Sequence, residues 1–149
     1  MRTQKVLLPL SGLLLAGLLI TLSGCGQSIG AQPPAPTIPP GNKPDTVRIE
    51  IDQPSPTTQK KPVVTLKTAG LVQQLYATTY ALPLMPPNQF CTMERGPHYT
   101  LTFQQGGKTL ATVLAQRDGC RPVTIAGEKQ DRQATENFWT QLDKVISAS

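Results

Sequence analysis

The segment 99–126 constrains the fold more than any other part of the chain. Two runs of alternating character, YTLTFQ and KTLATVLAQR, flank the dipeptide Gly106-Gly107. A two-residue glycine turn between such runs is typical of a β-hairpin, because glycine readily adopts the positive φ angles that tight hairpin turns need. A regular register from this turn predicts one apolar face, formed by the pairs Phe103–Leu110, Leu101–Thr112 and Tyr99–Leu114.

A second tight turn is predicted at Asp118-Gly119. Pairing Arg117 with Cys120 across it sets Leu114 opposite Val123 and Thr112 opposite Ile125, which selects the same apolar face. Pro122 would remove a hydrogen-bond donor from this ladder, so we expect a bulge there or an edge position for the last strand.

Two strands and a helix are expected before this hairpin. VRIEID at 47–52 alternates apolar and charged residues, and PVVTL at 62–66 is a short β-branched run. Thr68 then begins a predicted helix that runs to Leu82, where Pro83 stops it. Its apolar residues recur every three or four positions and form one stripe: Leu71, Val72, Leu75, Tyr76, Tyr80 and Leu82.

A second amphipathic helix is predicted at about 132–147. Its inner face should hold Ala134, Phe138, Trp139, Leu142, Val145 and Ile146. Two such helices and a one-sided sheet must bury their apolar faces against each other. We therefore predict an α+β domain at 46–149, a two-layer sandwich of a four- to five-stranded antiparallel sheet with both helices on one face.

The N-terminus has the layout of a secretory signal. Arg2 and Lys5 precede an almost wholly apolar run at 6–20. That run is shorter than the roughly 20 residues needed to cross a bilayer. It also contains proline and glycine, so a plain transmembrane anchor is the weaker interpretation.

Leu22-Ser23-Gly24-Cys25 closely resembles the lipobox of bacterial lipoproteins. The resemblance implies that residues 1–24 are a signal peptide, cleaved between Gly24 and Cys25, and that Cys25 carries diacylglycerol, with two acyl chains such as palmitate. The alternative is a buried cysteine in a membrane helix. Two acyl chains would hold the protein stably on the extracytoplasmic face of a membrane. In lipoproteins of two-membrane bacteria, an aspartate directly after the lipidated cysteine retains the protein at the inner membrane. This chain has Gly26 at that position, so in a cell with two membranes we expect the protein at the outer membrane.

The next segment, 26–45, is rich in proline and small polar residues. Such a composition cannot bury enough apolar surface to offset its ordering entropy. We expect a linker here, and a long loop of similar composition at 53–62.

Acylation of Cys25 leaves Cys91 and Cys120, which most simply pair in an oxidising compartment. The rival interpretation keeps Cys91 as a reactive thiolate near His98. A metal site is not expected, because zinc needs four ligands and His98 is the one histidine of the sequence. We expect no cofactor.

The sequence offers no convincing set of catalytic residues. His98 lacks a well-placed nucleophile, since the serines lie in predicted linkers and at the tail. Glu94, Asp118, Glu128 and Asp131 show no spacing of a paired-carboxylate or metal site. Gly106-Gly107 lacks the Lys-Ser/Thr of a phosphate loop, and Trp139 is expected in the core.

Charge also limits the possible partners. The chain without residues 1–24 has 12 basic and 9 acidic side chains, scattered along the sequence. Nucleic-acid binding would need a concentrated basic patch, so we do not expect it.

FCTMERGPHYTLTF, the later Gly119-Cys120 and Phe138-Trp139 are together similar to a layout in uncharacterised bacterial secreted proteins and lipoproteins. This resemblance covers roughly 69–147 and implies no activity. We expect a non-catalytic module that binds an envelope protein or a wall component. An inhibitor or accessory subunit of a secreted or envelope enzyme is the alternative, and an enzyme using His98 is less favoured.

Overall fold

The computed structural model describes residues 38–39, 41–54 and 62–149. The predicted signal peptide, Cys25, most of the linker and most of the 53–62 loop lie outside these residues. Within them the fold is mixed α+β, with one antiparallel sheet and two helices, as the sequence predicts.

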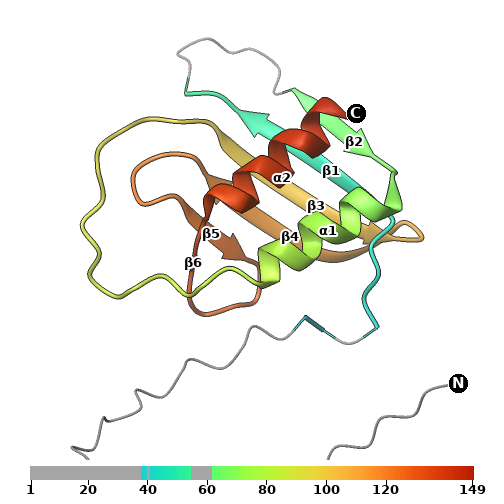
Figure 1. The fold of residues 1–149 in the computed structure, drawn as a ribbon, viewed down its shortest axis with the longest axis horizontal. Coiled ribbons are helices and arrows are strands. Elements are labelled where there is room, and N and C mark those ends of the chain that lie inside the picture. The colour runs from blue at the N-terminus through green and yellow to red at the C-terminus, as the bar shows by residue number, and fades with distance from the viewer. Residues whose placement is uncertain (1–37, 40, 55–61) are drawn as a thin grey trace, which may run out of the picture. The chain divides into compact units, whose positions relative to one another are not determined.

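The sheet has six strands in the order β2-β1-β3-β4-β5-β6, where four to five were predicted (Figure 1). The strands are β1 (Thr46–Asp52), β2 (Val63–Leu66), β3 (His98–Gln105), β4 (Lys108–Gln116), β5 (Pro122–Ile125) and β6 (Arg132–Gln133). The additional strand is β6, whose two residues were predicted to begin the last helix. Pro122 is the first residue of β5, where a missing N–H disturbs the ladder least.

The helices are α1 (Ala69–Tyr80) and α2 (Glu136–Ser147). Thr68 is the N-cap of α1, but its side chain makes no capping hydrogen bond. The hydroxyl of Thr135 instead accepts from the Phe138 amide at 3.3 Å and begins α2 four residues later than predicted. Neither helix of the described residues has the length and apolar character needed to span a bilayer.

Both helices cross in front of the sheet in the view of Figure 1. Their buried side chains join those of the strands in one hydrophobic core. Its fully buried members include Val47, Ile49, Leu75, Tyr76, Leu101, Phe103, Val113, Val123, Phe138, Trp139 and Leu142.

The β3–β4 hairpin turns at Gly106 and Gly107, both with positive φ, as predicted. The predicted register is wrong beyond the turn. A bulge between Phe103 and Gln104 shifts the pairing by one residue, so Phe103 lies opposite Ala111 rather than Leu110. A shift of one residue moves every side chain of β4 beyond the bulge to the face of the sheet opposite the predicted one.

The exchange of faces extends into the next pair of strands. Val113, not Thr112, lies opposite Ile125, and Ala115, not Leu114, lies opposite Val123. Val113 is fully buried. Leu114, predicted on the apolar face, is 37% exposed.

Candidate functional site

The segment 83–97, which we call the 83–97 loop, connects α1 to β3 and projects beyond the end of the sheet (Figure 1). Its first residues pair with the β6 region. The amide of Gln133 donates to the Pro83 carbonyl at 2.8 Å, and the amide of Met85 donates to the Asp131 carbonyl at 2.9 Å. The side chain of Gln130 also donates to the Met85 carbonyl, at 3.0 Å. The start of the loop is thereby fixed to the edge of the sheet.

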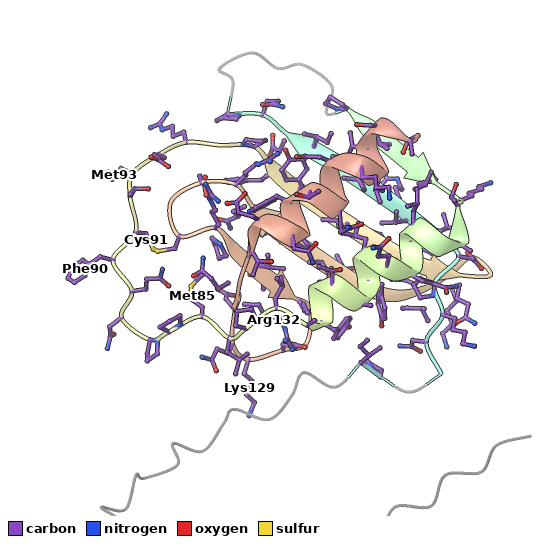
Figure 2. The ribbon with its side chains drawn as sticks, in the orientation of Figure 1. Met85, Phe90, Cys91, Met93, Lys129 and Arg132 are labelled. Carbon is purple, nitrogen blue, oxygen red and sulfur yellow. A yellow bond between two sulfur atoms is a disulfide. The ribbon has the colours of Figure 1, made fainter. Side chains whose placement is uncertain are left out.

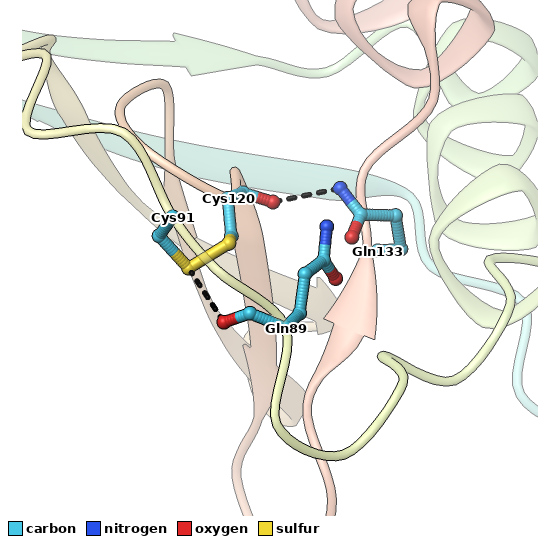
Figure 3. Close-up of a disulfide and its surroundings, with 4 residues drawn as sticks. All are labelled: Gln89, Cys91, Cys120 and Gln133. Atoms are coloured by element: carbon cyan, nitrogen blue, oxygen red, sulfur yellow. Dashed lines mark hydrogen bonds between the residues drawn. A yellow bond between two sulfur atoms is a disulfide. The ribbon is translucent and has the colours of Figure 1, made fainter.

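The middle of the loop is held by a disulfide between Cys91 and Cys120, whose Cα atoms lie 4.7 Å apart (Figure 3). Cys120 is buried and lies in the β4–β5 turn, whereas Cys91 is exposed. The Cys120 carbonyl accepts from Gln133 Nε2 at 2.7 Å, and Cys91 Sγ lies 3.7 Å from the Gln89 carbonyl oxygen. The two cysteines that the sequence analysis paired thus join the loop to the sheet.

The end of the loop lies backbone against backbone on the β4–β5 turn. A Cβ atom at Gly96 would lie 2.1 Å from the Arg117 carbonyl oxygen, and one at Gly119 would lie 2.9 Å from the Thr92 carbonyl oxygen. The Arg117 amide donates to the Pro97 carbonyl at 3.0 Å. Glycine is required at residue 96 because a side chain would collide with main-chain atoms that cannot move independently.

Two large apolar side chains on this constrained loop are fully exposed. Phe90 has a relative exposure of 101% and Met93 of 99%. Figure 2 shows Phe90 directed away from the body of the domain, with Met93 further along the same loop. The exposure of these two side chains was not predicted from the sequence.

A pocket of about 400 Å³ lies between the loop and the β4–β5 turn. Its volume falls within the range of small-ligand sites. The lining residues are Met85, Cys91, Thr92, Met93, Glu94, Gln116, Asp118, Gly119, Cys120, Pro122 and Asp131. They combine apolar and sulfur-containing groups with three carboxylates, and none of these described residues is Lys, Arg or His. Glu94, Asp118 and Asp131, which are far apart in the sequence, therefore line the same pocket.

The fourth acid, Glu128, has a structural partner instead. Its carboxylate accepts two hydrogen bonds of 2.9 Å from the buried guanidinium of Arg132. Trp139 lies in the core as predicted, with the Arg117 guanidinium 5.1 Å from its ring centroid. Arg117 in turn makes a bidentate ion pair with Asp143.

His98 begins β3, and its Nε2 lies 2.7 Å from Asp118 Oδ2. This carboxylate partner was not anticipated, because the two residues are 20 positions apart and meet only through the hairpin. A general base also needs a nucleophile. Among the described residues no hydroxyl or thiol hydrogen-bonds to His98, and Cys91 is engaged in the disulfide. The pair therefore joins the start of β3 to the β4–β5 turn.

Within the described part of the chain, no three His, Cys, Asp or Glu side chains lie close enough together to hold a metal ion. Comparison of the chain with protein-family models, curated proteins and solved structures gives no match.

Proposed function

We propose that this chain is an extracytoplasmic lipoprotein, anchored through Cys25, whose domain binds another envelope protein without catalysing a reaction. The supporting observation is that Phe90 and Met93 are fully exposed on a loop fixed at its start, middle and end. Aromatic and methionine side chains are enriched in protein interfaces. A loop that is already ordered loses little entropy on binding, so its apolar contacts contribute more fully to affinity.

The place where the linker joins the domain supports a partner other than the anchoring membrane. The Asp45 carboxylate accepts from the Gly106 amide at 2.7 Å, so the incoming chain meets the domain at the β3–β4 turn. The 83–97 loop enters the opposite end of β3, at His98. An eight-residue strand is about 25 Å long. The loop is therefore displaced from the point of tethering.

The position of the helices further supports a two-layer architecture. We infer that α1 and α2 form one layer over the sheet, since their buried residues belong to the same core as the inward side chains of the strands. The polar face of the sheet, with Arg48, Thr102 and Thr112, would then form the outer surface.

The anchor is tested by the substitution Cys25→Ser. We expect the wild-type protein to fractionate with membranes, and the variant to be released or to remain unprocessed. A correctly cleaved Cys25→Ser protein that still fractionates with membranes would contradict lipidation.

Docking is tested by placing a photo-crosslinking phenylalanine analogue at residue 90 of the full chain in its own cells. We expect one discrete protein adduct, lost when Met93 is changed to serine. The matched control places the analogue at Lys108, an exposed residue that begins β4 and lies opposite Gln105, at the end of β3 away from the loop. Adducts of equal yield from both positions, adducts that persist in the Met93→Ser protein, or none from residue 90 would contradict docking through the loop.

The exposed Phe90 beside a disulfide also favours the alternative of an enzyme inhibitor, since a rigid apolar projection can fill a cleft. The crosslinked partner distinguishes the two functions. An inhibitor predicts that the partner is an enzyme whose activity falls on addition of the wild-type protein, but not of Phe90→Ser. A binding module predicts no such loss.

A further inference from the structure

We propose that the pocket beside the 83–97 loop receives an arginine side chain of the partner protein. This inference rests on the proposed function and adds the chemical class of the group that is recognised. It combines three observations: an open cavity of about 400 Å³, an apolar and sulfur-lined wall, and an excess of carboxylates. The fully exposed Phe90 and Met93 stand on the same loop and would supply the surrounding apolar contact.

The three carboxylates of the pocket have unused hydrogen-bonding capacity. Glu94 makes no hydrogen bond or ion pair with any described residue. Asp118 is engaged through Oδ2 by His98, and Asp131 through Oδ1 by the Thr124 hydroxyl. The second oxygen of each aspartate therefore remains available to a donor that enters from outside.

None of the described residues that line the pocket is a cation. The Arg121 guanidinium pairs with Glu136, and that of Arg132 with Glu128. Arg95 and Lys129 are not among the residues that line the pocket. His98, which also lies outside the lining, contacts the Asp118 carboxylate. The described lining itself holds three acidic side chains and no basic one, which favours a cationic occupant.

The spread of the carboxylates favours a guanidinium over a compact cation. Among the described residues, the acids do not approach one another closely enough to hold a metal ion. A guanidinium has five N–H donors in a plane and is weakly hydrated, so it can bond carboxylates on different sides of a cavity. The methylene stem of arginine can pack on Met85, Met93 and the disulfide.

The methionines give a direct test. Of the three methionines in the sequence, Met85 and Met93 line the pocket and Met1 lies in the predicted signal peptide. The purified full chain in detergent micelles is labelled with ¹³C at the methionine methyl groups and titrated with acetyl-Gly-Arg-Gly-amide. Met85→Leu and Met93→Leu assign the two resonances. We expect both to shift and to saturate.

A peptide with citrulline in place of arginine has nearly the same shape without the charge. We expect it to bind at least about ten-fold more weakly, since charge-assisted hydrogen bonds are lost. Glu94→Gln should weaken binding of the arginine peptide several-fold. The matched control Glu50→Gln, which removes an acid of β1 that pairs with Arg48, should leave it unchanged.

Equal binding of the citrulline peptide, or no shift of either methionine methyl group, would overturn the proposal. A lysine peptide that binds as tightly as the arginine peptide would contradict the choice of a guanidinium. None of these results depends on the cellular partner. If the arginine peptide does not bind but residue 90 still gives a specific crosslink, the proposal of an arginine pocket is wrong and the proposal of docking through the loop stands.

Discussion

The structural role of Arg132 differs from the one that the sequence predicts. We predicted it as the first residue of the last helix, yet it lies in β6 and its side chain is buried. Its NH1 group donates to the carbonyls of Tyr80 and Leu82, at 3.0 and 2.9 Å, and its other nitrogens bind Glu128. Arg132 therefore satisfies the open carbonyls at the end of α1, a role that no local pattern reveals because its partners are about 50 positions away.

Arg132→Met should destabilise the domain by about 3 kcal/mol, because it leaves Glu128 unpaired and two buried carbonyls without donors. Arg121→Met is the matched control, since the Arg121–Glu136 pair is exposed. Its effect should stay within about 0.5 kcal/mol. Urea unfolding measures both, and equal losses in the two variants would contradict a special role for Arg132.

Gly96 offers a second test at the residue scale. Gly96→Ala should destabilise the domain by several kcal/mol or displace the end of the 83–97 loop, because the new Cβ would overlap the Arg117 carbonyl. Gly70→Ala is the control, since Gly70 lies in α1 with open space around it. It should be neutral or stabilise by about 0.5 kcal/mol. Thermal unfolding distinguishes the two, and a stabilised Gly96→Ala protein would show that the contact is absent.

At the scale of elements, periodicity predicts the strands and helices well but not their exact registration. The residues predicted to line both helices are buried or packed against the core, because a 3.6-residue period is a local property. The predicted register of β4 was wrong because we assumed an unbroken ladder of strand pairs from the Gly106-Gly107 turn. A bulge inserts one residue without any clear mark in the sequence.

The register is testable with two neighbouring residues of β4. Val113→Ala should cost about 2 kcal/mol, because Val113 is fully buried and the change leaves a cavity. Leu114→Ala should cost less than about 1 kcal/mol, although leucine loses more atoms, since Leu114 lies on the partly exposed face. Chemical denaturation gives both values. The opposite order would support the regular register and contradict the bulge.

At the scale of the whole molecule, the pocket could not be predicted from the sequence. Met85 and Asp131 are 46 positions apart and meet because the start of the 83–97 loop pairs with β6. The cysteine pair was predictable, since elimination left two thiols. The exposure of Phe90 was not, because an apolar residue in an irregular segment is as compatible with burial as with display.

The disulfide joins the 83–97 loop to the β4–β5 turn of the sheet across 29 positions of the sequence. Chain entropy gives about 3.5 kcal/mol for a loop of this length, a large share of the 5–15 kcal/mol typical of small domains. We expect reduction to lower the melting temperature markedly. Cys91→Ala and Cys120→Ala should cost similar amounts, and the double variant little more than either.

The same bond should matter for function, because it holds Phe90 and Met93 in place and forms one wall of the pocket. Reduction should therefore weaken the photo-crosslink at residue 90 under conditions where the sheet remains folded, as circular dichroism can establish. The rival hypothesis of a reactive Cys91 thiolate predicts rapid labelling of Cys91 in the native, unreduced protein. Two alkylatable thiols in protein denatured without reductant, taken from its own compartment, would end the disulfide hypothesis.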